Sequence, residues 1–253
     1  MDEEGVDPGE LRAALEFIRR INSLLGYTRA TLAHLKRFSR SWKKGERIEI
    51  LDLATGSADI PRAILKWAAQ AGHDVHIVGV DRHPVTVRQA EEGEPNARLK
   101  IVQGDVFDLP FQAGSFDYVL TAMFLHHLED HEVVEVLRTM GRLARRGVIV
   151  ADLLRHYRAY AWVCLFTAFS TPMVRHDARV SVGQAFAKKE VLQLRDEAGI
   201  NFAQYYRHFG HRFVLSGEKA DSKRGTLSGP EAPNGGQPDG CDGAGGLLDR
   251  RSG

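Results

Sequence analysis

Residues 48–59 read IEILDLATGSAD. This stretch begins with a mainly apolar run, continues into a turn of small residues, and reaches Asp59 just before the helical pattern that Pro61 opens. A buried strand that passes through a tight turn into a helix is the first half of a βαβ unit. The stretch therefore predicts an α/β fold that is built on a parallel sheet.

Strands and helices continue to alternate along the chain on the C-terminal side of this stretch. The predicted strands are 48–54, 75–81, 97–105, 116–123 and 147–154, and the predicted helices run from Asp59 to Gly72, from Pro84, from Glu129 to Ala144 and from Lys188 to Ala198. The adjoining segments INFAQYYRHFG (200–210) and HRFVLSG (211–217) predict an antiparallel terminal hairpin on the sheet edge. Together these segments predict a doubly wound, mostly parallel sheet.

Three segments lie outside this alternation. Apolar residues at three- and four-residue spacing between Glu10 and Trp42 predict two amphipathic helices with a break near Gly26. The aromatic and basic residues 155–187 predict a helical lid, and the Gly-, Pro- and Ser-rich residues 218–253 predict a disordered tail. The expected organisation is an N-terminal cap (1–44), a folded domain (45–217) and the tail.

The composition narrows the classes of function. A formal net charge of +1 gives no general electrostatic reason to expect a nucleic acid partner. A local basic cluster precedes the first strand, for which a solvated helix end is the expected explanation: Lys36, Arg37, Arg40, Lys43, Lys44 and Arg47. Two scattered cysteines, Cys164 and Cys241, predict neither a disulfide framework nor a metal site. Without a signal-peptide pattern or an apolar run of membrane-spanning length, we expect a cytoplasmic protein.

Acidic residues follow three successive predicted strands. Asp52 lies near the end of the first strand, Asp81 ends the second and Asp105 ends the third. Ligands of open parallel sheets bind at the carboxyl ends of the strands, where one carboxylate can accept from ribose hydroxyls and another from the exocyclic amine of a base. Aspartate also ends strands and caps helices for local reasons, and Asp59 is expected to cap the first helix. The three positions together favour a nucleoside site.

The turn ATGSAD (54–59) differs from the GxGxxG fingerprint of dinucleotide-binding proteins. Ala54 stands where the first glycine of that fingerprint belongs. A dinucleotide needs its pyrophosphate to approach the helix amides closely, so the turn favours a ligand without phosphates. A nicotinamide-dependent oxidoreductase is for this reason the weaker alternative.

Four motifs occur in order: LDLATGSADIP (51–61), VGVD (78–81), QGDVFDLPF (103–111) and SFDYVLTAMFLHHL (115–128). The series resembles that of class I S-adenosylmethionine-dependent methyltransferases, and is most similar to the small-molecule branch that includes ubiquinone and menaquinone biosynthesis enzymes. The resemblance covers residues 48 to about 155. It implies a Rossmann-like, seven-stranded fold, S-adenosylmethionine as cofactor and S-adenosylhomocysteine as product.

The resemblance also implies roles for individual residues. Asp52, Ala54 and Gly56 would line the amino acid end of the cofactor, Asp81 with Arg82 would hold the ribose, and Asp105 with Val106 would receive the adenine edge. Thr55, Asp59 and Ala122 complete the expected cofactor-binding set. Family members usually have glycine where this chain has Ala54 and Ala58, and alanine tightens the turn wherever a positive φ is required.

Candidate catalytic groups follow the fourth and fifth strands. A methyl transfer to a hydroxyl needs its proton removed, and His126, beside His127, has the chemistry of a general base. Asp152 ends the fifth strand and could bind the acceptor or orient a histidine, and His176 with Asp177 offers a second pair in the lid. Structural roles remain open for each of them: packing or capping for His126, strand termination for Asp152 and a surface turn for His176.

The predicted lid indicates the kind of acceptor. It carries six bulky apolar or aromatic side chains: Tyr157, Tyr160, Trp162, Phe166, Phe169 and Met173. As a lid, these side chains favour a small hydrophobic acceptor, such as a phenol, quinone, polyketide or lipid-like molecule. Alternatively, the segment is an ordinary buried helix of the core. A weaker alternative is that it contacts a membrane surface. No NPPY-like segment follows the fourth strand, so nucleic acid is not the expected substrate. The hypothesis is an O-methyltransferase, or a C-methyltransferase, acting as a monomer or homodimer; an inactive cofactor-binding regulatory protein is the rival.

Overall fold

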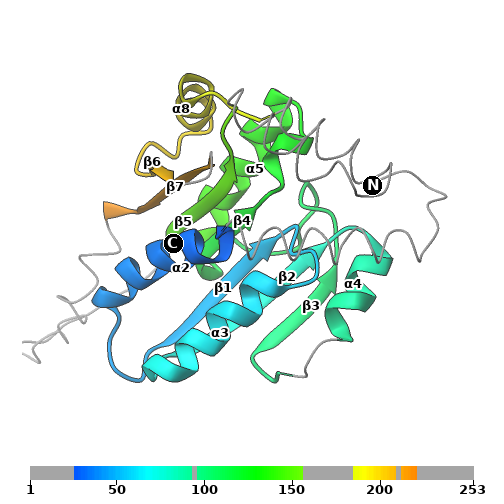
Figure 1. Ribbon diagram of the computed structural model, residues 1–253, viewed down its shortest axis with the longest axis vertical. Helices are drawn as coiled ribbons and strands as arrows, with labels where there is room; N and C mark the ends of the chain where they lie inside the picture. The colour runs from blue at the N-terminus through cyan, green and yellow to red at the C-terminus, as the bar shows by residue number, and fades with distance from the viewer. Residues whose placement is uncertain (1–25, 93–95, 156–184, 209–211, 221–253) are drawn as a thin grey trace, which may run out of the picture.

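The computed structural model describes residues 26–92, 96–155, 185–208 and 212–220. In this part of the chain seven strands form one sheet in the order β3-β2-β1-β4-β5-β7-β6 (Figure 1). The strands are β1 (Arg47–Leu53), β2 (Asp74–Asp81), β3 (Leu99–Gln103), β4 (Phe116–Ala122), β5 (Ala144–Leu153), β6 (Gln204–His208) and β7 (Arg212–Glu218). The first five are parallel, and β7 is antiparallel to β5 and β6. The predicted seven-stranded, mostly parallel sheet with its terminal hairpin is confirmed.

Helices cover both faces of the sheet. The described helices are α2 (Tyr27–Phe38), α3 (Asp59–Ala71), α4 (Pro84–Glu91), α5 (Asp130–Leu143) and α8 (Lys188–Glu197), with 3₁₀ turns η1 (Ser39–Ser41) and η2 (Leu125–His127). One apolar core contains Leu35 of α2 and Ile64 of α3, and the other contains Leu137 of α5 and Leu194 of α8. The strand order reverses between β1 and β4, so a ligand is expected at the carboxyl ends of these strands.

Local helix signals hold with one exception. Gly72 ends α3 with a left-handed φ of 72°, and Pro84 is the first residue of α4. The prediction that Asp59 caps α3 is wrong: the cap position is Ala58, with φ 58° and no side-chain cap. Asp59 is the first helical residue, and its carboxylate accepts a hydrogen bond from Ser57 Oγ at 2.5 Å. The helix therefore begins at Asp59, as predicted, but the left-handed Ala58 and not Asp59 occupies the cap position.

Strand boundaries differ from the expected ones by a few residues. Strand β3 ends at Gln103, two residues before Asp105, and β5 begins at Ala144, directly where α5 ends. Strand β7 continues through Glu218, one residue past the predicted domain boundary, because Glu218 still pairs with Gly147 of β5. Apolar runs show which segments are buried strands but not where the pairing of each strand stops.

Most of the predicted lid, residues 156–184, lies outside the described residues, as do residues 1–25 and 221–253. His176 and the six bulky side chains of the lid prediction belong to this part. The two ends of the lid segment are described and lie side by side: Leu154 forms a parallel bridge with Phe186, and Arg155 N donates to Phe186 O at 2.8 Å. The described residues on the two sides of 156–184 therefore meet at the carboxyl end of β5. No helix within the described ranges is long and apolar enough to cross a membrane.

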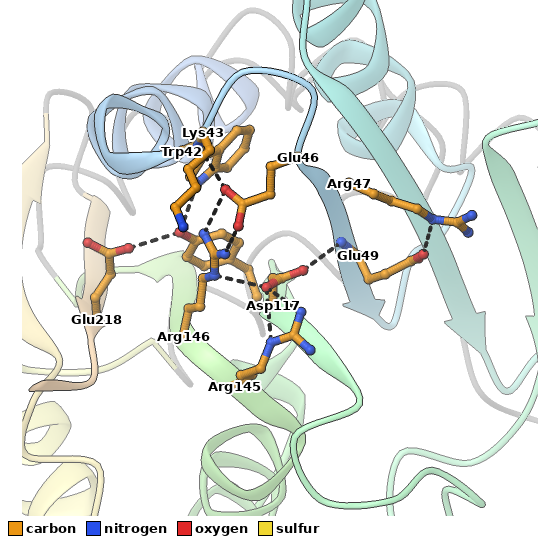
Figure 2. Close-up of polar contacts among 10 residues, drawn as sticks. Trp42, Lys43, Glu46, Arg47, Glu49, Asp117, Arg145, Arg146 and Glu218 are labelled. Carbon is orange, nitrogen blue, oxygen red and sulfur yellow. Dashed lines mark hydrogen bonds and ion pairs between the residues drawn. The ribbon is translucent and has the colours of Figure 1, made fainter. Parts of the chain in front are cut away.

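A polar network closes the opposite, amino end of the sheet (Figure 2). Asp117 of β4, which is fully buried, accepts a hydrogen bond from Glu49 N of β1 at 3.0 Å. Its carboxylate also pairs with Arg145 Nη2 at 2.8 Å and Arg146 Nε at 2.9 Å, both from β5. The network joins three neighbouring strands and lies away from the carboxyl ends where a ligand is expected.

We expect Asp117→Ala to lower the free energy of unfolding by about 2 kcal/mol, because it leaves the amide of Glu49 without its buried acceptor and Arg146 with Glu46 as its remaining carboxylate partner. The side chain of Arg145 is 57% exposed, so water replaces part of its pairing and limits the loss. Urea unfolding measures the change, with Asp108→Ala, an exposed aspartate, as the control. Equal stability of the two variants would contradict the structural role of Asp117.

Candidate active site

The turn between β1 and α3 brings together acids from two strands. Thr55 Oγ1 donates to Asp52 Oδ2 at 2.6 Å, and Gly56 N donates to Asp81 Oδ2 at 2.9 Å. Gly79 of β2 allows this close arrangement, since a Cβ at that position would lie 2.8 Å from Thr55 Oγ1. The ends of β1 and β2 therefore present two carboxylates around one short turn.

The electrostatics of this turn favour a cationic ligand. Burial is the main effect that raises the pKa of Asp52 to about 7; the hydrogen bond from Thr55 opposes it, and the charges of Asp59 and Asp81 add to it. A positive charge at the carboxyl ends of β1 and β2 would relieve the repulsion among these three acids. The sulfonium and ammonium groups of S-adenosylmethionine are such charges, so the residues present fit this cofactor.

The backbone amides of the turn are already used within the protein. Thr55 N donates to Val80 O at 2.9 Å, Gly56 N to Asp81 at 2.9 Å, and Ala58 N to Thr55 O at 3.0 Å. A pyrophosphate would need amides of this kind as donors. Their internal hydrogen bonds count against a dinucleotide and agree with a ligand that lacks phosphates.

The other residues of the expected cofactor set lie along the same edge of the sheet. Asp105 follows β3 and accepts a hydrogen bond from Phe107 N at 3.0 Å, and Val106 beside it is buried. Arg82 is exposed directly after β2, and Ala122 is the last residue of β4. Their contacts with a cofactor stay a prediction.

His126 and Asp152 form a buried pair between the ends of β4 and β5. His126 Nδ1 lies 2.6 Å from Asp152 Oδ1, and the two side chains are 2% and 1% exposed. Leu125 N and Leu153 N donate to the same carboxylate at 2.8 and 2.7 Å. Burial acts to raise the pKa of Asp152, but the charge and hydrogen bond of His126, together with the two backbone donors, hold this pKa below its usual value.

Asp152 is therefore ionised at neutral pH and accepts from His126 Nδ1. In the neutral form of His126, Nδ1–H would donate to this carboxylate and Nε2 would be the nitrogen free to accept a proton. Two residues that the sequence patterns did not single out, Tyr27 and Arg212, are also buried close to the end of β5. The sequence carries one signal for this pair: Arg212 stands next to the apolar run Phe213–Leu215.

The alanines of the turn have the strained conformation that the sequence suggested. Ala54 has φ 53° and Ala58 has φ 58°. The left-handed region costs a non-glycine residue roughly 1–2 kcal/mol, against about 0.5–1 kcal/mol of extra chain entropy for glycine.

We therefore expect Ala54→Gly to raise the free energy of unfolding by up to about 1 kcal/mol. Urea unfolding again measures the change. Ala63→Gly, within the regular part of α3, is the control and should lower stability by a similar amount. A loss of stability in both variants would show that Ala54 is unstrained.

Comparison with known proteins agrees with this geometry. A methyltransferase domain model matches residues 50–147. The demethylmenaquinone methyltransferase of Staphylococcus carnosus is 30% identical over 113 residues, which are 44% of this chain and 45% of that protein. The corresponding Listeria monocytogenes enzyme is 27% identical over 183 residues, which are 64% of this chain and 73% of that protein. The chain thus aligns with less than half of the first relative and with most of the second.

Solved structures share the fold at low sequence identity. A methyltransferase from Aquifex aeolicus superposes with a TM-score of 0.58 at 15% identity, covering 84% of this chain and 98% of that protein. Human N-acetylserotonin methyltransferase superposes with a TM-score of 0.58 at 16% identity, and the match covers 84% of this chain and 56% of that protein. The matching domain, the bacterial relatives and the shared fold all make the chain similar to class I S-adenosylmethionine-dependent methyltransferases, and among them to the demethylmenaquinone methyltransferases.

Proposed function

We propose that this enzyme methylates a hydroxyl oxygen of a small hydrophobic acceptor, with His126 as the general base. The observation that carries the proposal is the buried contact of 2.6 Å between His126 Nδ1 and Asp152 Oδ1. The names of the bacterial relatives, demethylmenaquinone methyltransferases, support a small acceptor with an apolar ring system.

The residues of the chain have separate tasks in this proposal. When bound, S-adenosylmethionine supplies an electrophilic methyl carbon on its sulfonium. His126 Nε2 removes the acceptor's hydroxyl proton as the oxygen becomes the nucleophile, and Asp152 stabilises the imidazolium that results. Because Asp152 acts through His126, it is a positioning residue.

Cofactor binding is assigned to the ends of the first three strands. Asp52 would face the cationic amino acid end, Asp81 would accept from the ribose hydroxyls, and Asp105 would accept from the adenine amine. This order follows the order β1, β2, β3 across the sheet, which supports one extended ligand along the edge.

The acceptor can be found with isotopically labelled cofactor. The protein is incubated with a cell extract and S-adenosylmethionine that carries a labelled methyl group, and products are separated by mass spectrometry. We expect one new labelled small molecule that a matched reaction with His126→Gln does not form. A labelled methyl group attached to a carbon of the product would show C-methylation and contradict the proposed O-methylation. Binding of the cofactor without any labelled product would favour the inactive regulatory protein, a rival that the strained Ala54 and Ala58 support.

Cofactor affinity should depend on pH through Asp52. In the free protein the pKa of Asp52 is about 7, which is above its value in the unfolded chain. The carboxyl group therefore keeps its proton between about pH 4 and pH 7, and ionising it in this range lowers the stability of the fold. A bound ammonium favours the carboxylate, so binding of S-adenosylhomocysteine releases a proton in this window. We expect the affinity to rise by up to about tenfold per pH unit below 7 and to level off above it.

Calorimetry of S-adenosylhomocysteine binding at pH 6 in two buffers of different ionisation enthalpy measures the released proton. Asp52→Asn, which can still accept from Thr55, should abolish both the proton release and the rise in affinity. An identical pH dependence in the wild-type protein and in Asp52→Asn would refute this role of Asp52.

A further inference from the structure

A buried arginine and a buried tyrosine lie against each other beside the carboxyl end of β5. Arg212 begins β7, pairs with Leu153 of β5 and is only 4% exposed. Tyr27 begins α2, which packs against β5 and β7, and is fully buried. Arg212 Cζ lies 4.4 Å from the centroid of the Tyr27 ring.

Within the described part of the chain, neither side chain has the partners that its chemistry requires. The Tyr27 hydroxyl and Arg212 Nε have no hydrogen-bond partner of good geometry, although the two side chains interact with each other, and no carboxylate there forms an ion pair with Arg212. Buried polar groups are nearly always bonded, and a buried charge without a counter-ion is costly. A ligand that supplies a negative oxygen would satisfy both groups at once.

The surroundings keep the Tyr27 hydroxyl ready to donate. Burial, and after it the charge of Asp152, raises the pKa of Tyr27; the charge and hydrogen bond of Arg212 oppose this rise without cancelling it, so the hydroxyl keeps its proton. Gly26 allows the approach of the guanidinium: it has φ 79°, and a Cβ there would lie 3.2 Å from Arg212 Nη1. The pair is thus built into the fold at the break between the two N-terminal helical patterns.

We infer that Arg212 and Tyr27 form a subsite for an anionic oxygen of the methyl acceptor, a carboxylate or an ionised enol or phenol. The inference rests on the proposed function, because it places the acceptor at the end of β5 beside the His126–Asp152 pair. The position supports it: Leu153, the β5 partner of Arg212, directly follows Asp152 in the chain. The inferred subsite narrows the expected acceptor from small hydrophobic molecules in general to those that carry an acidic group.

Simple anions can test the subsite on the full chain saturated with S-adenosylhomocysteine. Benzoate is compared with the neutral benzamide, and 4-nitrophenolate with nitrobenzene, by thermal shift and calorimetry. We expect the anion of at least one pair to bind roughly tenfold more tightly than its neutral counterpart. The pair that shows the preference distinguishes a carboxylate from a phenolate.

Arg212→Met should abolish this preference and should itself unfold at an equal or higher temperature, because it removes an uncompensated buried cation. Arg212→Lys and the exposed control Arg207→Met should keep the preference, and Tyr27→Phe should weaken it. The inference fails if anions and neutral probes bind alike to the wild-type protein, or if Arg212→Met retains the preference. The wild-type comparison decides the matter even where Arg212→Met does not fold. If the wild-type protein does not bind S-adenosylhomocysteine at all, that result would count against the proposed function and not against the anion subsite.

Discussion

His126→Gln is expected to lower the rate of methyl transfer by about 10²–10⁴-fold while leaving cofactor affinity nearly unchanged. Glutamine has a similar size and can still donate to Asp152, but it has no basic nitrogen to receive a proton. The loss therefore falls on the chemical step. Single-turnover transfer of a labelled methyl group to the acceptor, with cofactor affinity measured separately, distinguishes this outcome from a folding defect.

Two neighbouring variants show whether the effect belongs to the buried pair. Asp152→Asn should slow the reaction by a smaller factor and change its pH dependence, because the carboxylate that stabilises the imidazolium is lost. His127→Gln, at the exposed neighbouring position, should leave the rate close to that of the wild-type protein. A wild-type rate in His126→Gln would mean that the reaction needs no general base at this position.

Asp81→Ala is expected to weaken the binding of S-adenosylhomocysteine by about 2–3 kcal/mol, roughly 30- to 150-fold. The variant would lose charge-assisted hydrogen bonds to the ribose hydroxyls. It would also free the amides of Gly56 and His83, which donate to this carboxylate at 2.9 and 3.0 Å. Calorimetric titration at neutral pH gives the affinity.

Asp81→Asn separates the two contributions of Asp81. An asparagine oxygen can still accept from one backbone amide, so the turn is better preserved while the negative charge is lost. We expect this variant to bind more tightly than Asp81→Ala but more weakly than the wild-type protein. Unchanged affinity in Asp81→Ala would show that the ribose assignment is wrong.

The central strands were predictable because their signals are local. The apolar run and small-residue turn of 48–59 belong to one strand, one turn and one helix, and the structure contains these elements close to the predicted bounds. The start of α3 at Asp59 was predicted, but the cap position was not, because the left-handed conformation of Ala58 depends on the path of the turn. The pattern of apolar residues in a sequence does not indicate backbone conformation of this kind.

The candidate site was predictable in its parts but not in its contacts. His126 and Asp152 could each be proposed from their positions after apolar strands, whereas their hydrogen bond depends on β4 and β5 being neighbours. Tyr27 and Arg212 are far apart in the chain, and they meet because β7 lies next to β5 and beneath α2. An apolar strand pattern around Arg212 does not indicate which helix covers it.

We propose that the carboxyl edge of β1, β2 and β3 binds S-adenosylmethionine rather than a dinucleotide. Parallel calorimetric titrations of the full chain with S-adenosylhomocysteine and with NADH test it most directly. We expect saturable binding of one S-adenosylhomocysteine per chain and no measurable binding of NADH. Binding of NADH alone, or no binding of S-adenosylhomocysteine at millimolar concentration, would contradict it.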